Sequence, residues 1–314
     1  MGRCYSDKSV QDDQFMWPFH IIDGGNDQIK IKLDSVNKSF SPEEISAYIL
    51  RQIKKTCEDY LKKPVNDVVL SVPAYFDNKM KSATRTAGFI AGLNVKHIIT
   101  EPTAAALTYG FRDLKICESK QILVYDLGGG TFDISILKIC GRSYDVLAIK
   151  GDSHLGGEDF TDRMVAHFIQ EFESKYKTKW EATNRLMMHR LREACEKAKR
   201  RLSDANCSET SVELDQFWVD KMSNEINFYT SITREKFEQI NAHLFKKTLT
   251  LIFSCIKEAK LKIDEIDAVI LVGGSTKIPF IQKFLTDNFG QERVKFSDNT
   301  IEAVAMGALL SRQR

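Results

Sequence analysis

A run of glycines between two apolar segments has the clearest chemical potential in this sequence. Residues 122–137 read Ile-Leu-Val-Tyr-Asp-Leu-Gly-Gly-Gly-Thr-Phe-Asp-Ile-Ser-Ile-Leu. Glycines between strands allow several backbone N–H groups to point to one side, which creates a concave site for phosphate oxygens. A tight hairpin whose glycines serve only the turn is the alternative, and this segment alone does not decide between them.

Two carboxylates flank the glycines, Asp126 before them and Asp133 after them. Carboxylates repel phosphate oxygens, so both residues make chemical sense if a cation or ordered water separates them from the anion. The pattern is that of a metal–nucleotide site.

A second glycine group, Gly273-Gly274-Ser275, lies between an apolar segment and a helix that Pro279 would begin. Glycine lets the backbone approach a ligand, and a helix N-terminus favours anions. A Gly-Gly pair after a strand is nevertheless common in α/β proteins, so by itself it indicates little.

A charged helix face carries Glu196, Lys199, Arg200 and Ser203, whose offsets of three, four and seven place them together. A charged helix face is usually only solvated, and that reading stays open. Glu101 leaves two readings as well, because a carboxylate at a helix start caps the helix or orients a water molecule.

The segments around these residues alternate between strand and helix patterns. Ser41-Pro42-Glu43-Glu44 predicts a capping box that opens a helix, and apolar residues recur every fourth position from Ile45 to Leu61, which predicts one buried face. Further strands are expected at 67–72, 95–100, 144–150 and 268–272. The fold class is therefore α/β, and a break near residues 113–120 suggests two lobes.

The amino-acid composition limits the partners and the cellular compartment that we expect for the protein. A net charge of +2 over 314 residues gives no strong attraction to nucleic acid or to an anionic membrane, and we expect neither as a partner. The 7 cysteines are scattered, without zinc-site spacing, which favours a reducing compartment. We expect a cytoplasmic protein, with the nucleus as the alternative location.

The order of the motifs resembles the nucleotide-binding domain of the heat-shock 70 kDa chaperones of the DnaK type, within the actin-like ATPase superfamily. The resemblance covers nearly the whole chain. The segments that carry it are 72–76, 91–95, 101–106, 126–133, 151–160, 194–200, 228–233 and 272–279.

The resemblance implies a two-lobed actin-like ATPase fold of the ribonuclease H-like type. Residues 1–117 would form an N-terminally truncated lobe I and residues 118–314 lobe II, with a peripheral subdomain at 158–232. The last helix, 301–314, would return towards lobe I.

The resemblance also implies ATP or ADP as ligand, with Mg²⁺ and, as a further cation, K⁺. Asp126 and Asp133 would act at the metal, and Glu101 and Thr131 would join them in catalysis. The remaining nucleotide contacts would be Gly128, Gly129, Gly130, Thr131, Gly157, Glu158, Asp159, Glu196, Lys199, Arg200, Ser203, Gly274, Ser275, Thr276 and Lys277.

The chain departs from the family pattern at four places. It ends at Arg314, so we expect it to lack the family's peptide-binding domain. It begins after the family's first phosphate loop and its lysine, so we expect hydrolysis to be weakened, since one positioned proton-transfer group contributes about 10²–10⁴ in rate. Lys277 stands where the family usually has arginine, and Ile301 where it has aspartate.

We therefore expect a nucleotide-binding module of a chaperone-type ATPase, with catalysis left undecided. Co-chaperones and nucleotide exchange factors are the implied partners. A non-enzymatic protein that binds co-chaperones, a decoy, and a truncated gene product remain as alternatives. A sugar kinase on the same superfold fits less well, because segment 151–160 and the Glu196 helix match the chaperone branch.

Overall fold

The computed structural model describes residues 1–14, 19–33, 37–110, 118–180, 185–219, 225–296 and 300–311. The chain divides into two compact units, Met1–Leu107 with Val304–Arg314, and Thr108–Ala303. The break predicted near 113–120 falls largely on residues 111–117, which lie outside the described ranges. The predicted domain boundary after residue 117 therefore stays a prediction.

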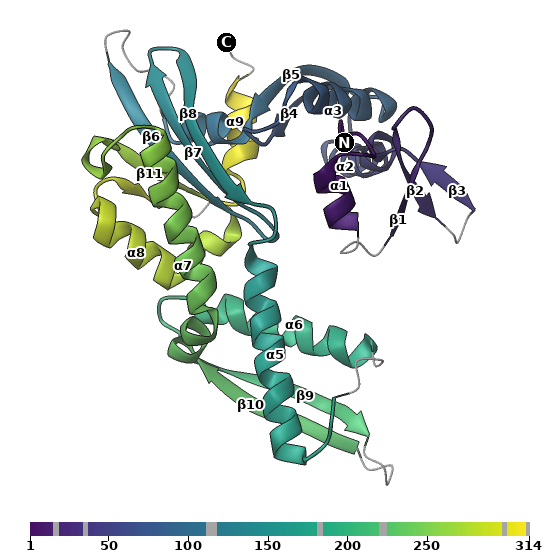
Figure 1. The fold of residues 1–314 in the computed structure, drawn as a ribbon, viewed down its shortest axis with the longest axis vertical. Coiled ribbons are helices and arrows are strands. Elements are labelled where there is room, and N and C mark those ends of the chain that lie inside the picture. Colours follow the sequence, from purple (N-terminus) through teal and green to yellow (C-terminus); the bar gives the residue numbers. More distant parts are fainter. Residues whose placement is uncertain are drawn as a thin grey trace. The chain divides into compact units, whose positions relative to one another are not determined.

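Unit 1 contains two small sheets and the helices around them (Figure 1). Strands β1–β3 form an antiparallel sheet, and β4 and β5 pair in parallel. The last helix, α9, packs closely on α4. The contact is so close that a Cβ at Gly307 would collide with the Ala104 carbonyl. The bounds are α1 Lys8–Asp13, β1 His20–Asp23, β2 Ile29–Leu33, β3 Lys38–Phe40, α2 Pro42–Leu61, β4 Asp67–Val72, α3 Asn78–Ile90, β5 Asn94–Thr100, α4 Glu101–Thr108 and α9 Ala303–Ser311.

Helix α2 begins with the capping box that the sequence predicts. The Ser41 side chain accepts a hydrogen bond from the Glu44 backbone N–H at 3.2 Å, and the Glu44 carboxylate accepts one from the Ser41 N–H at 2.7 Å. These two bonds satisfy backbone donors that the first helical turn leaves free.

The predicted buried face of α2 is wrong. Ile49, Ile53 and Leu61 are 60%, 53% and 47% exposed. Ala47, only 1% exposed, and Leu50 pack instead against the end of α3 and the turn after it. Four-residue spacing shows which side chains share a face, but only the packing of neighbouring elements decides which face is covered.

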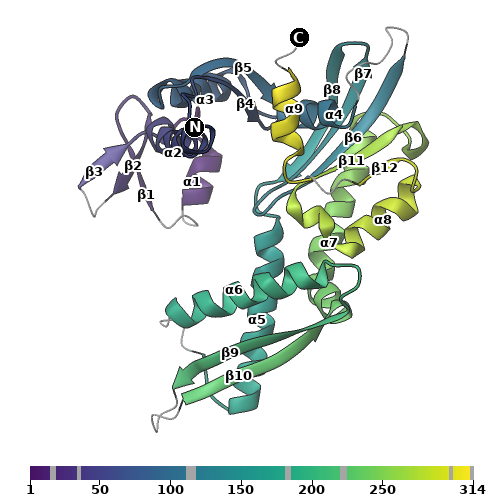
Figure 2. The ribbon, with the colours of Figure 1, turned by 180° about the vertical axis from the view of Figure 1, so that it is seen from behind.

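Unit 2 is built on a five-stranded sheet of order β12-β11-β6-β7-β8. Strands β6, β7 and β8 form an antiparallel meander, and β11 runs parallel to β6 and to β12. Figure 2 shows β12 and α8 at the β11 side of this sheet. The bounds are β6 Ser119–Leu127, β7 Phe132–Cys140, β8 Ser143–Asp152, α7 Arg234–Glu258, the 3-10 helices η3 Ile263–Glu265 and η4 Gly274–Lys277, β11 Ala268–Val272, α8 Pro279–Phe289 and β12 Val294–Lys295.

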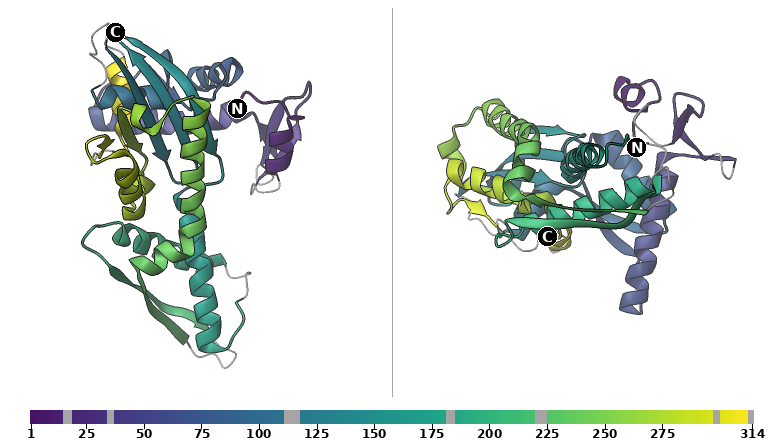
Figure 3. Two further views of the ribbon diagram at one scale, coloured as in Figure 1. Left: turned by 60° about the vertical axis from the view of Figure 1, so that its left-hand side comes forward. Right: turned by 90° about the horizontal axis from the view of Figure 1, so that it is seen from below.

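Two further helices and a hairpin complete unit 2: α5 Gly157–Tyr176, α6 Arg185–Leu202, β9 Glu209–Val219 and β10 Glu225–Thr233. Helices α5 and α7 pack on each other, α6 packs on β9, and β9 pairs with β10 (Figure 3). Phe172, Phe217 and Phe228 are fully buried between α5 and this hairpin. Helix α6 also packs on α5, and the Lys199 side chain of α6 reaches the Gly157 carbonyl at the start of α5.

The α/β class that the sequence predicts is confirmed, and the predicted strand at 67–72 coincides with β4. Among the described residues, no helix combines the length and the hydropathy that a membrane span needs.

Candidate functional site

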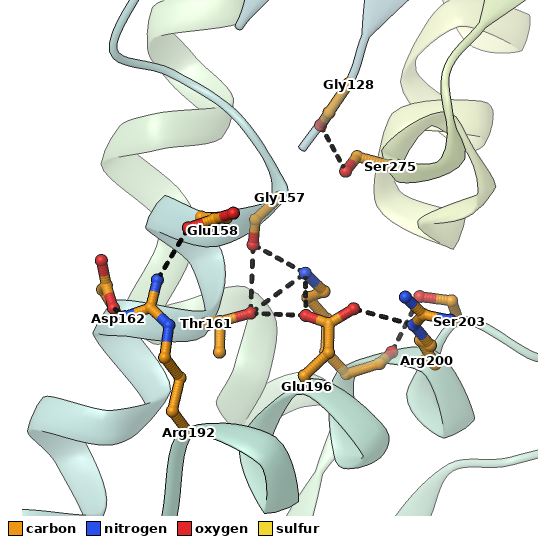
Figure 4. Close-up of polar contacts among 11 residues, drawn as sticks. Gly128, Gly157, Glu158, Thr161, Asp162, Arg192, Glu196, Arg200, Ser203 and Ser275 are labelled. Carbon is orange, nitrogen blue, oxygen red and sulfur yellow. Dashed lines mark hydrogen bonds and ion pairs between the residues drawn. The ribbon is translucent and has the colours of Figure 1, made fainter. Parts of the chain in front are cut away.

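The glycine turn between β6 and β7 is held from two sides. The Gly128 carbonyl accepts a hydrogen bond from the Gly157 backbone N–H at 3.0 Å. It also accepts one from the Ser275 hydroxyl at 2.9 Å (Figure 4). The Glu158 N–H, one residue further along α5, donates to the Gly129 carbonyl at 2.7 Å. The start of α5 and helix η4 thus position the turn through its carbonyl groups.

Two further glycines, Gly156 and Gly273, lie so close to the backbone of the turn that a side chain would not fit. A Cβ at Gly156 would lie 2.5 Å from the Gly129 carbonyl oxygen. Gly273 has a φ of +88°, and a Cβ there would collide with the Leu127 carbonyl. Any larger residue would displace the turn, so these glycines belong to the architecture of the site.

Asp126 and Asp133 form a directly opposed pair in the β6–β7 ladder. Burial, and then the charge of Asp133, raise the pKa of Asp126 to about 6. Burial also raises the pKa of Asp133 to about 6. Two carboxylates that resist ionisation together fit a bound cation, and Mg²⁺ commonly uses one or two carboxylates plus phosphates and water. No group of three or more metal-ligating side chains occurs among the described residues.

A buried network joins α5 to α6. The Lys199 ammonium donates to the Gly157 carbonyl at 2.6 Å and to the Thr161 hydroxyl at 3.0 Å, and lies 2.6 Å from a Glu196 carboxylate oxygen. The Thr161 hydroxyl is also 2.9 Å from that same carboxylate oxygen (Figure 4). The two helices are therefore held together by a charged residue that is only 7% exposed.

The Glu196 carboxylate is stabilised as an anion. Burial alone would raise its pKa, but hydrogen bonds from Lys199 and Arg200 outweigh burial and lower the pKa to about 2. The Arg200 Nε donates to the second carboxylate oxygen at 2.8 Å. Glu196 is thus a fixed negative charge at any physiological pH.

A cavity of about 890 Å³ connects the glycine turn to the charged face of α6. Its volume is in the range of small-molecule and cofactor sites. All of its lining residues belong to unit 2. They are Gly128, Gly129, Gly157, Glu158, Thr161, His189, Arg192, Glu193, Glu196, Lys197, Lys199, Arg200, Ser203, Gly274, Ser275, Lys277, Ile278 and Ile301.

Most of the nucleotide contacts predicted from the sequence line this cavity, and their roles stay predictions. Asp159 and Thr276 do not line it: Asp159 accepts from the Gly156 N–H at 2.8 Å, and Thr276 donates to the Gly273 carbonyl at 2.7 Å. Glu101 begins α4 in unit 1. The other predicted residues that are not among the lining residues are Asp126, Gly130, Thr131 and Asp133, at the turn or in its strands.

Some residues that line the cavity were not predicted from the sequence. His189, Arg192 and Glu193 extend the α6 stripe by one to two turns towards its N-terminus, so the spacing of Glu196 and Arg200 contained a signal for them. Thr161 lies four residues after Gly157 and therefore on the same side of α5. Nothing in its own sequence surroundings marks it as polar and buried.

The sequence of this chain is similar to a family model and to several known proteins. The family model described as "Hsp70 protein" matches residues 1–312. A "Heat shock 70 kDa protein" of Neurospora crassa is 47% identical over 98% of this chain, and "Heat shock cognate 70 kDa protein 3" of Dictyostelium discoideum is 46% identical over 98%. A ribosome-associated molecular chaperone of Saccharomyces cerevisiae is 44% identical over 98%.

The chain spans about half the length of these curated relatives: 46% of the Neurospora protein, 48% of the Dictyostelium protein and 49% of the Saccharomyces protein. The mixed α/β architecture agrees with the actin-like ATPase fold that the resemblance implied.

Proposed function

The chain belongs to the Hsp70 protein family, and on this premise we propose that it binds ADP or ATP, together with Mg²⁺, in the cavity of unit 2. The observation that carries the proposal is the course of the cavity, which runs from the glycine turn to the charged face of α6. A nucleotide likewise has a charged end and a polar, aromatic end. The backbone N–H groups of the turn suit the phosphates, and the polar side chains of α6 suit the hydroxyls of the nucleoside.

The phosphate end would lie at the turn. Gly129, Gly130 and Thr131 are exposed there, and a side chain at either glycine would meet nothing within 4 Å. Backbone N–H groups of such a turn suit phosphate oxygens. Asp126 and Asp133 would hold Mg²⁺ directly or through water, and the cation would offset the repulsion between their charges and the phosphates. Bound Mg²⁺ supplies charge neutralisation at the β- and γ-phosphates.

The nucleoside end would lie along α6. The Glu196 carboxylate accepts hydrogen bonds, which matches ribose hydroxyls. Arg200 is exposed and presents a planar guanidinium, which can stack on a base. Lys277, Gly274 and Ile301 line the cavity from other elements and would enclose the base.

We propose further that the chain takes part in the activity of its relatives as whole proteins. That activity would comprise ATP hydrolysis, chaperone activity and the binding of co-chaperones or exchange factors. The weakened hydrolysis expected from the sequence stays a prediction, which single-turnover measurement with MgATP tests. Protein partners that bind unit 2 without nucleotide remain the alternative function.

Titration calorimetry with MgADP tests nucleotide binding by the 314-residue chain. We expect binding that Gly129→Asp abolishes, because the new carboxylate would repel the phosphates at the turn. Asn206→Asp adds the same charge on an exposed turn that does not line the cavity, and we expect it to bind MgADP like the wild type. Absence of heat from folded wild-type protein, or equal binding by Gly129→Asp, would overturn the proposal.

A further inference from the structure

We propose that Thr161 is a positioning residue of the nucleotide site, which holds Lys199 and, through it and directly, the carboxylate of Glu196. This inference rests on the proposed function, since it assigns part of the same cavity.

Thr161 is a buried residue whose hydroxyl lies within hydrogen-bond distance of three polar groups. Its side chain is in the second turn of α5, and the residue is 2% exposed. The hydroxyl lies 2.9 Å from Glu196 Oε2, 3.0 Å from Lys199 Nζ and 3.1 Å from the Gly157 carbonyl. A hydroxyl has one proton to give and can accept from a lysine at the same time. Thr161 therefore accepts from Lys199 and donates to Glu196 or Gly157.

Lys199 is surrounded by three acceptors of the protein in this arrangement. An ammonium carries three N–H bonds, and three acceptors surround it: the Gly157 carbonyl, the Thr161 hydroxyl and Glu196 Oε2. With all three groups in place, Lys199 and Thr161 fix the position of Glu196 Oε2. The geometry thus makes Thr161 and Lys199 supports of the Glu196 carboxylate.

The orientation of Glu196 depends on this support. Arg200 Nε holds Oε1 from the solvent side, while Lys199 and Thr161 hold Oε2 from inside. Removing the Thr161 hydroxyl leaves a buried ammonium with one acceptor too few. An unsatisfied buried donor is unfavourable, so Lys199 or Glu196 must move to find another partner. Either movement changes what the cavity presents to a ribose.

Thr161→Val tests this role, because valine keeps the branched shape and removes only the hydroxyl. We expect the MgADP affinity to fall roughly tenfold, and Thr161→Ser to restore it close to the wild-type value. We expect 2′,3′-dideoxy-ADP to bind wild type and Thr161→Val equally, since it lacks the hydroxyls that Glu196 would accept. An equal loss for both ligands, or no rescue by serine, would overturn the inference.

Thr248→Val is the matched control, because Thr248 is a fully buried helical threonine of unit 2 that does not line the cavity. We expect it to bind MgADP like the wild type, and an equal loss there would make the Thr161 effect merely structural. Acetylation of Lys199, followed by mass spectrometry without ligand, gives a second readout. We expect faster acetylation in Thr161→Val, and an unchanged rate would overturn the inference. Failure of the wild type to bind MgADP would instead overturn the proposed function.

Discussion

Asp126 and Asp133 stand opposite each other in adjacent antiparallel strands, one residue pair from the glycine turn. Directly opposed like charges destabilise a sheet. The β6–β7 meander keeps them nonetheless, in a place where burial already disfavours ionisation. Such a pair has a chemical use if a cation binds beside it, and it also has a measurable cost in stability.

The first prediction concerns that cost. Both carboxyl groups have a pKa of about 6 in the folded chain, against an ordinary value of 3.8. The folded state therefore binds protons more tightly, and the free energy of unfolding falls as the pH rises from about 4 to about 6. We expect Asp133→Asn to be more stable than the wild type at pH 7 by ~1–2 kcal/mol, and equally stable at pH 4.

Urea denaturation at several pH values measures this difference. Asp145→Asn, on an exposed part of β8, serves as the control for removing one charge. A stability difference for Asp133→Asn that stays constant from pH 4 to pH 7 would contradict the assignment.

The second prediction concerns Glu196, whose contribution to the free energy of unfolding grows as the pH rises. The Glu196 pKa is lowered from 4.5 to about 2, so its stabilising contribution is present above pH 4.5 and is lost as the pH falls towards 2. The Glu196 side chain is 34% exposed, and solvent screens part of the effect. We expect Glu196→Gln to lower the free energy of unfolding by ~1–2 kcal/mol at pH 7.

Chemical denaturation at pH 7 and at pH 3 tests this expectation. Glu193→Gln changes an exposed residue of the same helix and should leave stability unchanged. The idea fails if both variants unfold like the wild type at pH 7.

The third prediction concerns the backbone contact between α5 and the turn. A Cβ at Gly156 would lie 2.5 Å from the Gly129 carbonyl oxygen, so Gly156→Ala must shift the turn. We expect a loss of ~1–3 kcal/mol in stability and weaker MgADP binding. Gly129→Ala has open space for its methyl group and should remain as stable as the wild type. Denaturation and calorimetry check both variants, and equal behaviour of the two would speak against a shift of the turn.

The fourth prediction addresses the nucleoside end. Lys277 lines the cavity, at a position where the resemblance described from the sequence implies an arginine in the family. An arginine there would add a planar surface for the base, so we expect Lys277→Arg to bind MgADP more tightly by ~0.5–2 kcal/mol. Affinity for pyrophosphate should not change, because it has no base to stack. Calorimetry with both ligands gives the answer, and tighter binding of pyrophosphate would mean that the arginine contacts the phosphates instead of the base.

Local features of the sequence predicted much of the fold. The capping box at Ser41 and the strand at 67–72 depend on residues close in sequence, and both are present as expected. The face of α2 was predicted wrongly, because Ile49 and Ile53 share a side of the helix that no described element covers. Local spacing contains no information about which distant element arrives beside a helix.

The candidate site shows the same division. Its glycines, its carboxylates and the α6 stripe could be found from residue types and spacing, since these chemistries need particular residues in particular order. The partners of Lys199 could not, because Thr161 and Gly157 lie 38 and 42 residues away in the chain. Only the packing of α5 on α6 decides that this ammonium bonds to the protein, since a buried donor takes the acceptors that tertiary structure brings to it.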